Sequence, residues 1–298
     1  MVERVLAQLP GVCALGEVVH LWERGIRLDE RCSCGEHFSA CPFWLQVGDR
    51  AFGGWDRVDV DVVRRLAAEV DRTRFIPLAA TAGRLSARNA VMREYGDYYA
   101  RVYAAAEDVS GASIVIDSSK HASTAFVLRK HPDIALRVVH MVRDSRGVAY
   151  SWTKRVLRPE VDPASEKALM RQYAPWESAL LWNAHNGAFA TLARLGTPTF
   201  RLYYEQLLKD PVRVFGELAE FLSESPAVMA DYVSADAVQL APAHQIAGNP
   251  MRFQTGEVLL RRDDAWRQNL SAGDRRLVTT LTAPLMLAYG YLKTSEQK

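Results

Sequence analysis

The stretch ALRVVHMVRDSRGVAYSW, residues 135–152, decides the fold expected for this chain. Residues 135–142 are mostly apolar or β-branched, as in a buried strand, and helical spacing follows after Ser145. Two further runs of this kind, residues 113–116 and 199–203, are also followed by helical patterns. Repeats of strand, polar turn and helix are typical of a parallel sheet with helices on its faces, so we expect an α/β fold.

Helical spacing also occurs away from these three strands. The expected helices, besides those that follow the strands, are residues 2–9, 58–72, 86–109, 165–195 and 271–289. Residues 25–56 contain several Cys and Gly residues and are expected to form an irregular excursion. We expect one domain over residues 1–298, in which residues 155–195 form a helical insertion.

Composition excludes several classes of protein. The 298 residues are 49% hydrophobic and 24% charged, which is ordinary for a globular domain, and the net charge of +2 predicts no nucleic-acid partner. No apolar run reaches the roughly 18 residues that span a bilayer, and the N-terminus lacks a signal-peptide pattern. All four cysteines lie within the first 41 residues, unlike a secreted disulfide framework, so we expect a cytoplasmic protein.

Polar residues follow two of the expected strands, where α/β sheets bind their ligands. Arg143 ends one strand, Ser151 lies eight residues later on the expected helix, and Arg155 lies four residues beyond it. Positions four apart share a helix face, so two guanidiniums and a hydroxyl can converge on one anion such as a phosphate. A local ion pair of Arg143 with Asp144, capping the helix, is the alternative interpretation.

The segment VRDSRGVAYSW, residues 142–152, resembles the 3′-phosphate-binding motif of sulfotransferases that use 3′-phosphoadenosine 5′-phosphosulfate (PAPS). The position of Arg155, four residues after Ser151, resembles that of an Arg in tyrosylprotein sulfotransferases. Other segments resemble bacterial, and especially actinobacterial, sulfotransferases in the same order along the chain. They are CSCGEHFSACPFW (32–44), AFGGWDR (51–57), VIDSSKHAS (115–123), RLYYEQLLKDP (201–211), HQIAGNPMRF (244–253) and residues 263–291.

This resemblance implies the residues that bind the nucleotide. Arg143, Ser151 and Arg155 match positions that hold the 3′-phosphate, and Tyr204 matches the tyrosine that lies against the adenine. Arg252 follows a Gly-Asn-Pro turn in a segment that touches the nucleotide in the family. An Arg beside such a turn suits a phosphate, because backbone amides and a guanidinium can bind together.

The resemblance also implies two catalytic residues. Lys120 matches the lysine that contacts the transferring group, where an ammonium stabilises charge on the leaving oxygen. Glu17 lies in a segment that resembles the one supplying the base in tyrosylprotein sulfotransferases, and a carboxylate can take the proton of an attacking hydroxyl. The alternative interpretation of Lys120 is a solvated lysine at the start of a helix. The alternative interpretation of Glu17 is a glutamate in a surface loop or at a helix N-terminus. His121 receives no role, because the family's histidine lies one position later, where this chain has Ala122.

We therefore expect a sulfotransferase that moves a sulfuryl group from PAPS to a hydroxyl of a small molecule, carbohydrate or lipid, releasing PAP without a metal. The excursion 25–56 and the insertion 155–195 are expected to contact the acceptor. The alternative is a catalytically inactive chain that binds PAP or acts as a structural partner. A P-loop nucleotide kinase shares the topology but is disfavoured, because no Walker lysine or Mg-binding acidic pair is apparent.

The family begins with a strand and a Gly- and Ser/Thr-rich loop that wraps the 5′-phosphosulfate. No such segment occurs in this sequence, and residues 2–12 resemble the sequence that follows that loop. The expected fold is therefore a P-loop-NTPase-like parallel sheet flanked by helices, lacking the first strand and the phosphosulfate loop. We expect the natural reading frame to extend upstream of Met1.

The cysteines at the start of the chain are a separate feature. Cys32, Cys34 and Cys41, with His37 between them, could form a zinc knuckle, but their spacing is not the usual paired CxxC. We expect a compact loop with partly buried thiols that holds no stoichiometric zinc.

Overall fold

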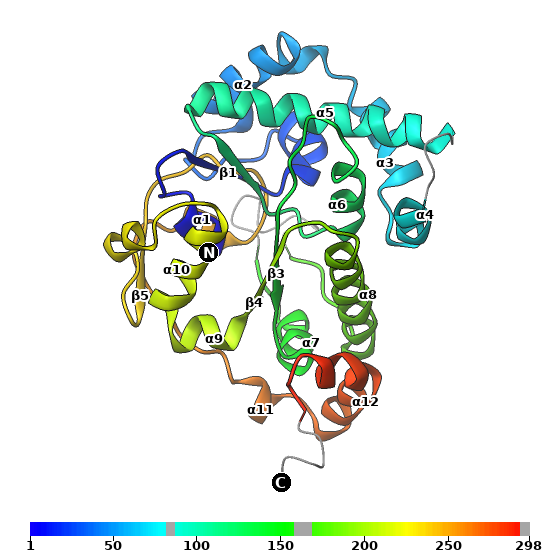
Figure 1. Cartoon of the computed structure of the whole chain (residues 1–298), viewed down its shortest axis with the longest axis vertical. Helices are drawn as coiled ribbons and strands as arrows, with labels where there is room; N and C mark the ends of the chain where they lie inside the picture. Colours follow the sequence, from blue (N-terminus) through cyan, green and yellow to red (C-terminus); the bar gives the residue numbers. More distant parts are fainter. Residues whose placement is uncertain (82–86, 158–168, 293–298) are drawn as a thin grey trace. The chain divides into compact units, whose positions relative to one another are not determined.

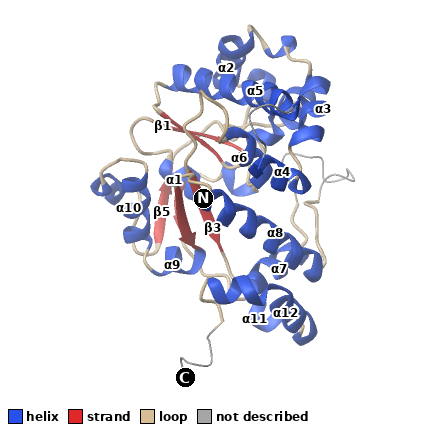
Figure 2. Cartoon of the chain, turned by 45° about the vertical axis from the view of Figure 1, so that its right-hand side comes forward, coloured by secondary structure: helices blue, strands red, loops and turns tan. Residues whose placement is uncertain are grey.

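A computed structural model describes residues 1–81, 87–157 and 169–292 (Figure 1). The chain divides into two compact units. The first unit comprises Met1–Arg137 and Asp210–Leu260, and the second comprises Val138–Lys209 and Arg261–Lys298. Helices make up most of the described chain, and its strands are short (Figure 2). No helix within the described ranges combines the length and apolarity needed to cross a membrane.

The first unit contains a parallel strand pair, β1 (Val12–Gly16) and β2 (Ile114–Asp117). Strand β1 was not expected from the sequence, because its apolar run is short and ends at a glycine. Gly16 has a φ of +82°, and it forms a parallel β-bridge with Ile246. A Cβ at Gly16 would collide with the carbonyl oxygen of Ile246. The pair aligns Gly16 with Asp117, so both strands end at the same edge.

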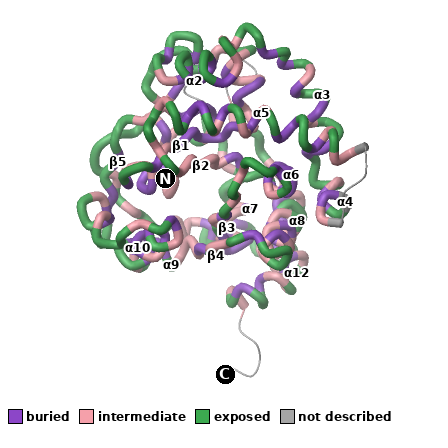
Figure 3. The backbone as a smooth tube through the Cα atoms, turned by 45° about the horizontal axis from the view of Figure 1, so that its top comes forward, coloured by how far each residue is buried: buried purple, intermediate pink, exposed green. Residues whose placement is uncertain are grey.

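The long helix α5 (Ala87–Ser110) packs against α2 (Pro42–Phe52) and α3 (Val60–Val70) in the first unit (Figure 1). Its buried face recurs every three or four residues, as the helical period requires (Figure 3). The residues of this face are Met92, Tyr95, Tyr99, Val102 and Ala106. Helices α3 and α5 confirm the sequence-based prediction.

Helix α2 lies inside the segment 25–56 that we expected to be irregular, so that prediction is wrong for these residues. The helix has ordinary start and stop signals, with Pro42 in its first turn and Gly53 in the left-handed conformation just after its end. Its buried Trp44, Val47 and Ala51 follow helical spacing. The cysteines and glycines on both sides of the helix favour loops, which hides this pattern in the sequence.

The rest of the first unit consists of shorter elements. The remaining α-helices are α1 (Val2–Leu6), α4 (Ile76–Thr81), α6 (Ala122–Leu128) and α10 (Pro211–Phe221). An antiparallel pair joins β5 (Ala237–Leu240) to β6 (Gly256–Leu259). The short 3₁₀-helices are Val18–His20, Phe38–Ala40, Trp55–Arg57, Thr73–Phe75, Pro226–Asp231 and Pro250–Phe253, and Leu21–Arg27 is a π-helix.

The second unit is built on a parallel pair, β3 (Val138–Val142) and β4 (Thr199–Tyr203), in which Val142 is aligned with Tyr203. Its helices are α7 (Ser145–Thr153), α8 (Pro175–Arg194), α9 (Tyr204–Lys209), α11 (Trp266–Asn269) and α12 (Ala272–Ala288). Helix α12 packs on α8 and α7, and buries Met286 with Val142 and Trp182.

The expected helices that follow the three predicted strands are present as α6, α7 and α10. The expected single sheet is not formed by the described strands, which pair only in twos. These strands are also less buried than expected, since all of β2 is half-buried and Met141 in β3 is 43% exposed. Of the predicted insertion 155–195, helix α8 is present, and residues 158–168 lie outside the described residues.

Candidate active site

The predicted catalytic residues Glu17 and Lys120 form an ion pair in the first unit. Glu17 directly follows β1, and Lys120 follows β2 by three residues. Because the two strands are parallel and in register at their ends, their carboxyl-terminal turns meet. The side chain of Lys120 is 68% exposed, whereas that of Glu17 is 11% exposed. The ammonium is therefore reachable from solvent, and the carboxylate lies in the more sheltered position.

Two side chains at and just after the end of β2 hold these turns in place. Asp117 Oδ1 accepts hydrogen bonds from the backbone N of Ser119 at 2.8 Å and of Val18 at 3.3 Å. Asp117 Oδ2 accepts one from the Tyr103 hydroxyl at 2.6 Å, and Ser119 Oγ accepts one from the backbone N of Val19 at 2.9 Å. Burial raises the pKa of Asp117, although these donors favour its ionised form. Asp117 thus ties the turn after Glu17 to the turn before Lys120.

Glu17 has further neighbours on its buried side. Its backbone N donates to the carbonyl oxygen of Ile246 at 2.9 Å, and a Cβ at Gly248 would lie 3.2 Å from its Oε1. His20 Nε2 lies 3.4 Å from Glu17 Oε2. Burial lowers the pKa of His20 to about 4, so the imidazole is neutral at ordinary pH. The sequence offered one signal for His20, since it lies one short turn after Glu17.

This arrangement pairs a proton acceptor with a cation. A sheltered carboxylate can accept the proton of a hydroxyl placed against it, and an exposed ammonium can bind an anionic group. While Lys120 and Glu17 neutralise each other, neither is free for a substrate.

In the second unit, two predicted nucleotide ligands lie together. Arg143 follows β3 and Tyr204 follows β4, and the guanidinium carbon of Arg143 lies 4.4 Å from the centre of the Tyr204 ring. The backbone oxygen of Arg143 accepts a hydrogen bond from Trp182 Nε1 at 3.0 Å. As in the first unit, parallel strands in register bring the turns after them together.

Arg143 does not form the helix-capping ion pair with Asp144 that was its alternative interpretation. Asp144 does cap α7, accepting from the backbone N of Arg146 at 2.9 Å, but its ion pair is with Arg146 at 2.6 Å. Arg143 instead donates from Nη2 to the backbone oxygen of Asp263 at 3.0 Å, and lies 3.5 Å from the Asp263 carboxylate. The guanidinium is therefore directed toward Tyr204 and Asp263.

The predicted placement of Ser151 and Arg155 on one helix face is wrong. Helix α7 ends at Thr153, because Lys154 adopts an extended conformation, and Arg155 lies beyond the helix. Both Ser151 and Arg155 are exposed. Lys154, which the sequence analysis did not select, binds the Asp263 carboxylate at 3.0 Å.

Asp263 is thus shared by two cations. Burial opposes its ionisation, but the hydrogen bond from Lys154 and the charge of Arg143 outweigh burial and lower its pKa.

A family model described as the sulfotransferase family matches residues 1–225 of the 298. The chain belongs to the sulfotransferase family. No curated protein and no solved structure was found to match the chain. The matched residues include both members of the Glu17–Lys120 pair and the Arg143–Tyr204 pair, but not Arg252.

Arg252 is 4% exposed and lies in the first unit. Its Nη1 donates to the carbonyl oxygen of Gly248 at 3.1 Å, and its Nη2 to that of Arg31 at 3.3 Å. These bonds hold the turn beside Glu17. The predicted contact of Arg252 with a nucleotide stays a prediction.

The first unit also has a hollow of about 350 Å³. The excursion expected to contact the acceptor supplies all of its lining. Aromatic and acidic side chains dominate, among them Asp29, Phe38, Asp49, Trp55 and Asp56. An apolar wall with a few polar groups is typical of sites for small organic molecules.

Proposed function

We propose that this member of the sulfotransferase family transfers the sulfuryl group of PAPS to the hydroxyl of a small molecule, carbohydrate or lipid. The ion pair of Glu17 and Lys120 at the joined ends of β1 and β2 carries the proposal. A base and a cation are the two groups that sulfuryl transfer to a hydroxyl requires. Family membership supports sulfuryl transfer, and the donor, the acceptor class and a cytoplasmic location are part of the proposal.

In the proposed reaction the acceptor oxygen attacks the sulfur of PAPS, and the bond from that sulfur to the bridging phosphate oxygen breaks. Glu17 takes the proton that the acceptor hydroxyl loses, and PAP leaves with the electron pair of the broken bond. Lys120 stabilises the negative charge that develops on the leaving oxygen. The reaction needs no metal ion, because the ammonium supplies the charge.

We propose Arg143 and Tyr204 as ligands of the nucleotide, with Ser151 and Arg155. Within the described residues, Arg143 donates one hydrogen bond to a protein group, and a guanidinium carries five N–H donors. Donors therefore remain for a phosphate, and the nearby Tyr204 ring offers a face on which an adenine can stack. We propose that Arg252 holds the turn at Gly248 in place.

The donor test uses the purified full chain with PAPS and a panel of alcohols, phenols and sugars. Chromatography measures PAP formation, and calorimetry compares binding of PAP with binding of ATP. Acceptor-dependent PAP formation and preference for PAP over ATP are expected. Binding of PAP without turnover on any acceptor would favour the inactive alternative, and preference for ATP would favour a nucleotide kinase.

A further inference from the structure

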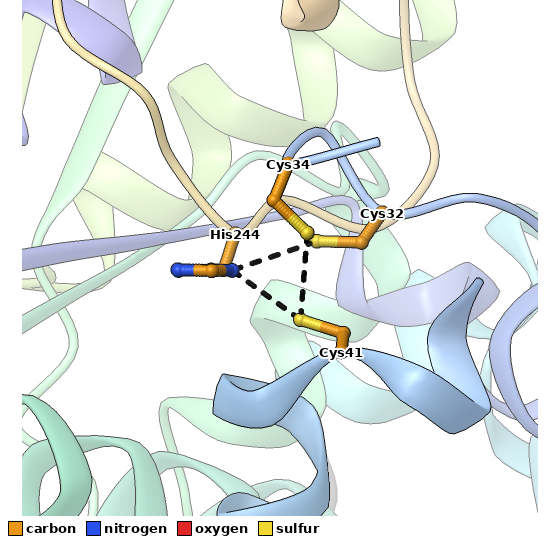
Figure 4. A group of neighbouring side chains, drawn as sticks. All are labelled: Cys32, Cys34, Cys41 and His244. Carbon is orange, nitrogen blue, oxygen red and sulfur yellow. Dashed lines mark hydrogen bonds between the residues drawn. The ribbon is translucent and has the colours of Figure 1, made fainter. Parts of the chain in front are cut away.

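Four side chains that can bind a metal converge in the first unit (Figure 4). Cys32, Cys34 and Cys41 come from one loop, and His244 comes from a distant part of the chain. Their ligand atoms all lie within 4.8 Å of one another. Cys41 Sγ is 3.7 Å from Cys34 Sγ and 3.3 Å from His244 Nδ1, and Cys32 Sγ is 4.0 Å from the same nitrogen.

Three of these separations are close to the edges of a zinc tetrahedron. Zinc binds thiolate sulfur at about 2.3 Å and imidazole nitrogen at about 2.0 Å, so tetrahedral ligand atoms lie about 3.5–3.8 Å apart. The separations of 3.3, 3.7 and 4.0 Å lie on either side of this range. Three sulfurs and one imidazole also form a common donor set of structural zinc sites.

The backbone holds the thiols in position. The backbone N of Cys32 donates to the oxygen of Glu36 at 2.9 Å, and that of Gly35 donates to the oxygen of Cys32 at 2.9 Å. Gly35 has a φ of +98°, which permits this tight turn. Cys41 lies at the N-terminus of α2, and Cys32 and Cys41 are buried whereas Cys34 reaches the surface. The site is thus formed by a rigid turn and a helix start.

The fourth ligand is fixed by its neighbours. Ser33 lies between the first two cysteines, and its Oγ donates to the oxygen of Ala243 at 2.6 Å and accepts from the backbone N of Gln245 at 2.7 Å. The backbone N of Ser33 donates to the oxygen of Gln245 at 3.0 Å. The residues on both sides of His244 are therefore bound to the cysteine turn. The ring of His244 also stacks on Phe43, at 5.3 Å and 15°.

We propose that Cys32, Cys34, Cys41 and His244 bind one structural zinc ion. All four ligands come from the protein, which leaves no open position for catalysis. The sequence-based expectation of no zinc considered His37 as the fourth ligand. His37 Nδ1 instead lies 2.8 Å from the carbonyl oxygen of Asp29, and His244 is 203 positions from Cys41, so no local spacing could reveal it.

The zinc would join two segments that shape the first unit. Two residues after His244, Ile246 donates from its backbone N to the oxygen of Leu15 and accepts from the backbone N of Glu17, both at 2.9 Å. The segment held by the metal therefore lies directly against the end of β1. Phe38, between Cys34 and Cys41, lines the hollow described above. The role of the metal is to fix this architecture, whatever reaction the protein performs.

Metal analysis of the full chain tests the proposal. Protein purified with a reductant and without chelator should contain about one zinc per chain by mass spectrometry, and cobalt loaded in its place should show the absorption of a tetrahedral thiolate site. Cys34→Ser and His244→Ala should reduce the zinc content to a small fraction of this value. Cys13→Ser and His37→Ala, which leave the four ligands intact, should retain it.

A second measurement covers variants that fail to fold. Wild-type protein stripped of metal should unfold at a lower temperature, and added zinc but not magnesium should restore the original value. A folded wild-type chain that contains no zinc and gains no stability from it would overturn the proposal. So would retention of zinc in both Cys34→Ser and His244→Ala.

Discussion

The guanidinium of Arg143 lies 4.4 Å from the centre of the Tyr204 ring, although 61 positions separate the two residues along the chain. The register of β3 and β4 places the two side chains together, because each follows the end of its strand. Arg143 thereby becomes part of a prearranged pair, in which a cation lies beside an aromatic surface.

This pair leads to a prediction about nucleotide affinity. Replacing Arg143 by Ala should weaken PAP binding by about 2–3 kcal/mol, the usual loss for a hydrogen bond to a charged group. Tyr204→Leu should weaken it less, because a stacking surface is lost and no charge is removed. Calorimetry measures both, with Arg213→Ala on the exposed face of α10 as the control. An unchanged affinity in Arg143→Ala would remove the support for this site.

The Glu17–Lys120 ion pair predicts that replacing either residue lowers turnover much more than it weakens PAP binding. Glu17→Gln and Lys120→Ala should each lower kcat about 100-fold or more, because a base or a stabilising charge is lost in the transition state. PAP affinity should change much less, since neither group is proposed to bind the 3′-phosphate. Steady-state kinetics with His121→Ala as the control measures this difference. Near-normal turnover in Glu17→Gln would require another base.

The hydrogen bond from Tyr103 to Asp117 predicts an effect on stability. Tyr103→Phe removes the donor at 2.6 Å from Asp117 Oδ2 and should lower the free energy of unfolding by about 1–3 kcal/mol. Urea titration gives the value. Tyr98→Phe is the matched control on the same helix, because its hydroxyl has no hydrogen bond among the described residues and little should change. Equal losses in both variants would show that the bond contributes nothing.

The lowered pKa of His20 predicts a dependence of stability on pH. Its pKa falls from 6.5 to about 4 in the folded chain, so between these values the unfolded chain binds more protons. Stability should therefore decrease as the pH falls through this range, and His20→Gln should show a weaker decrease. Urea titrations at several pH values within the range give the two slopes. Parallel slopes for wild type and variant would mean that His20 does not contribute.

Much of the local structure was predictable, since it depends on neighbouring residues. The helices over 58–72 and 86–109 repeat apolar residues with the helical period, and the structure forms α3 and α5 there. The strands predicted over residues 113–116 and 135–142 are also present, as β2 and β3, and the polar turns follow them. Helix α2 was missed although its signals are local, and the helix of Ser151 was predicted to extend past its actual end at Thr153.

Tertiary structure alone decided which distant residues meet. The contact of Glu17 with Lys120 depends on the register of β1 and β2, which local spacing does not encode. The approach of His244 to the cysteines depends on hydrogen bonds from Ser33 to the residues on either side of that histidine. The sequence by itself determined the family resemblance, the periodic helices and the kinds of side chain available. Their pairing was decided by strand register and hydrogen bonds between segments, because these join residues that lie far apart along the chain.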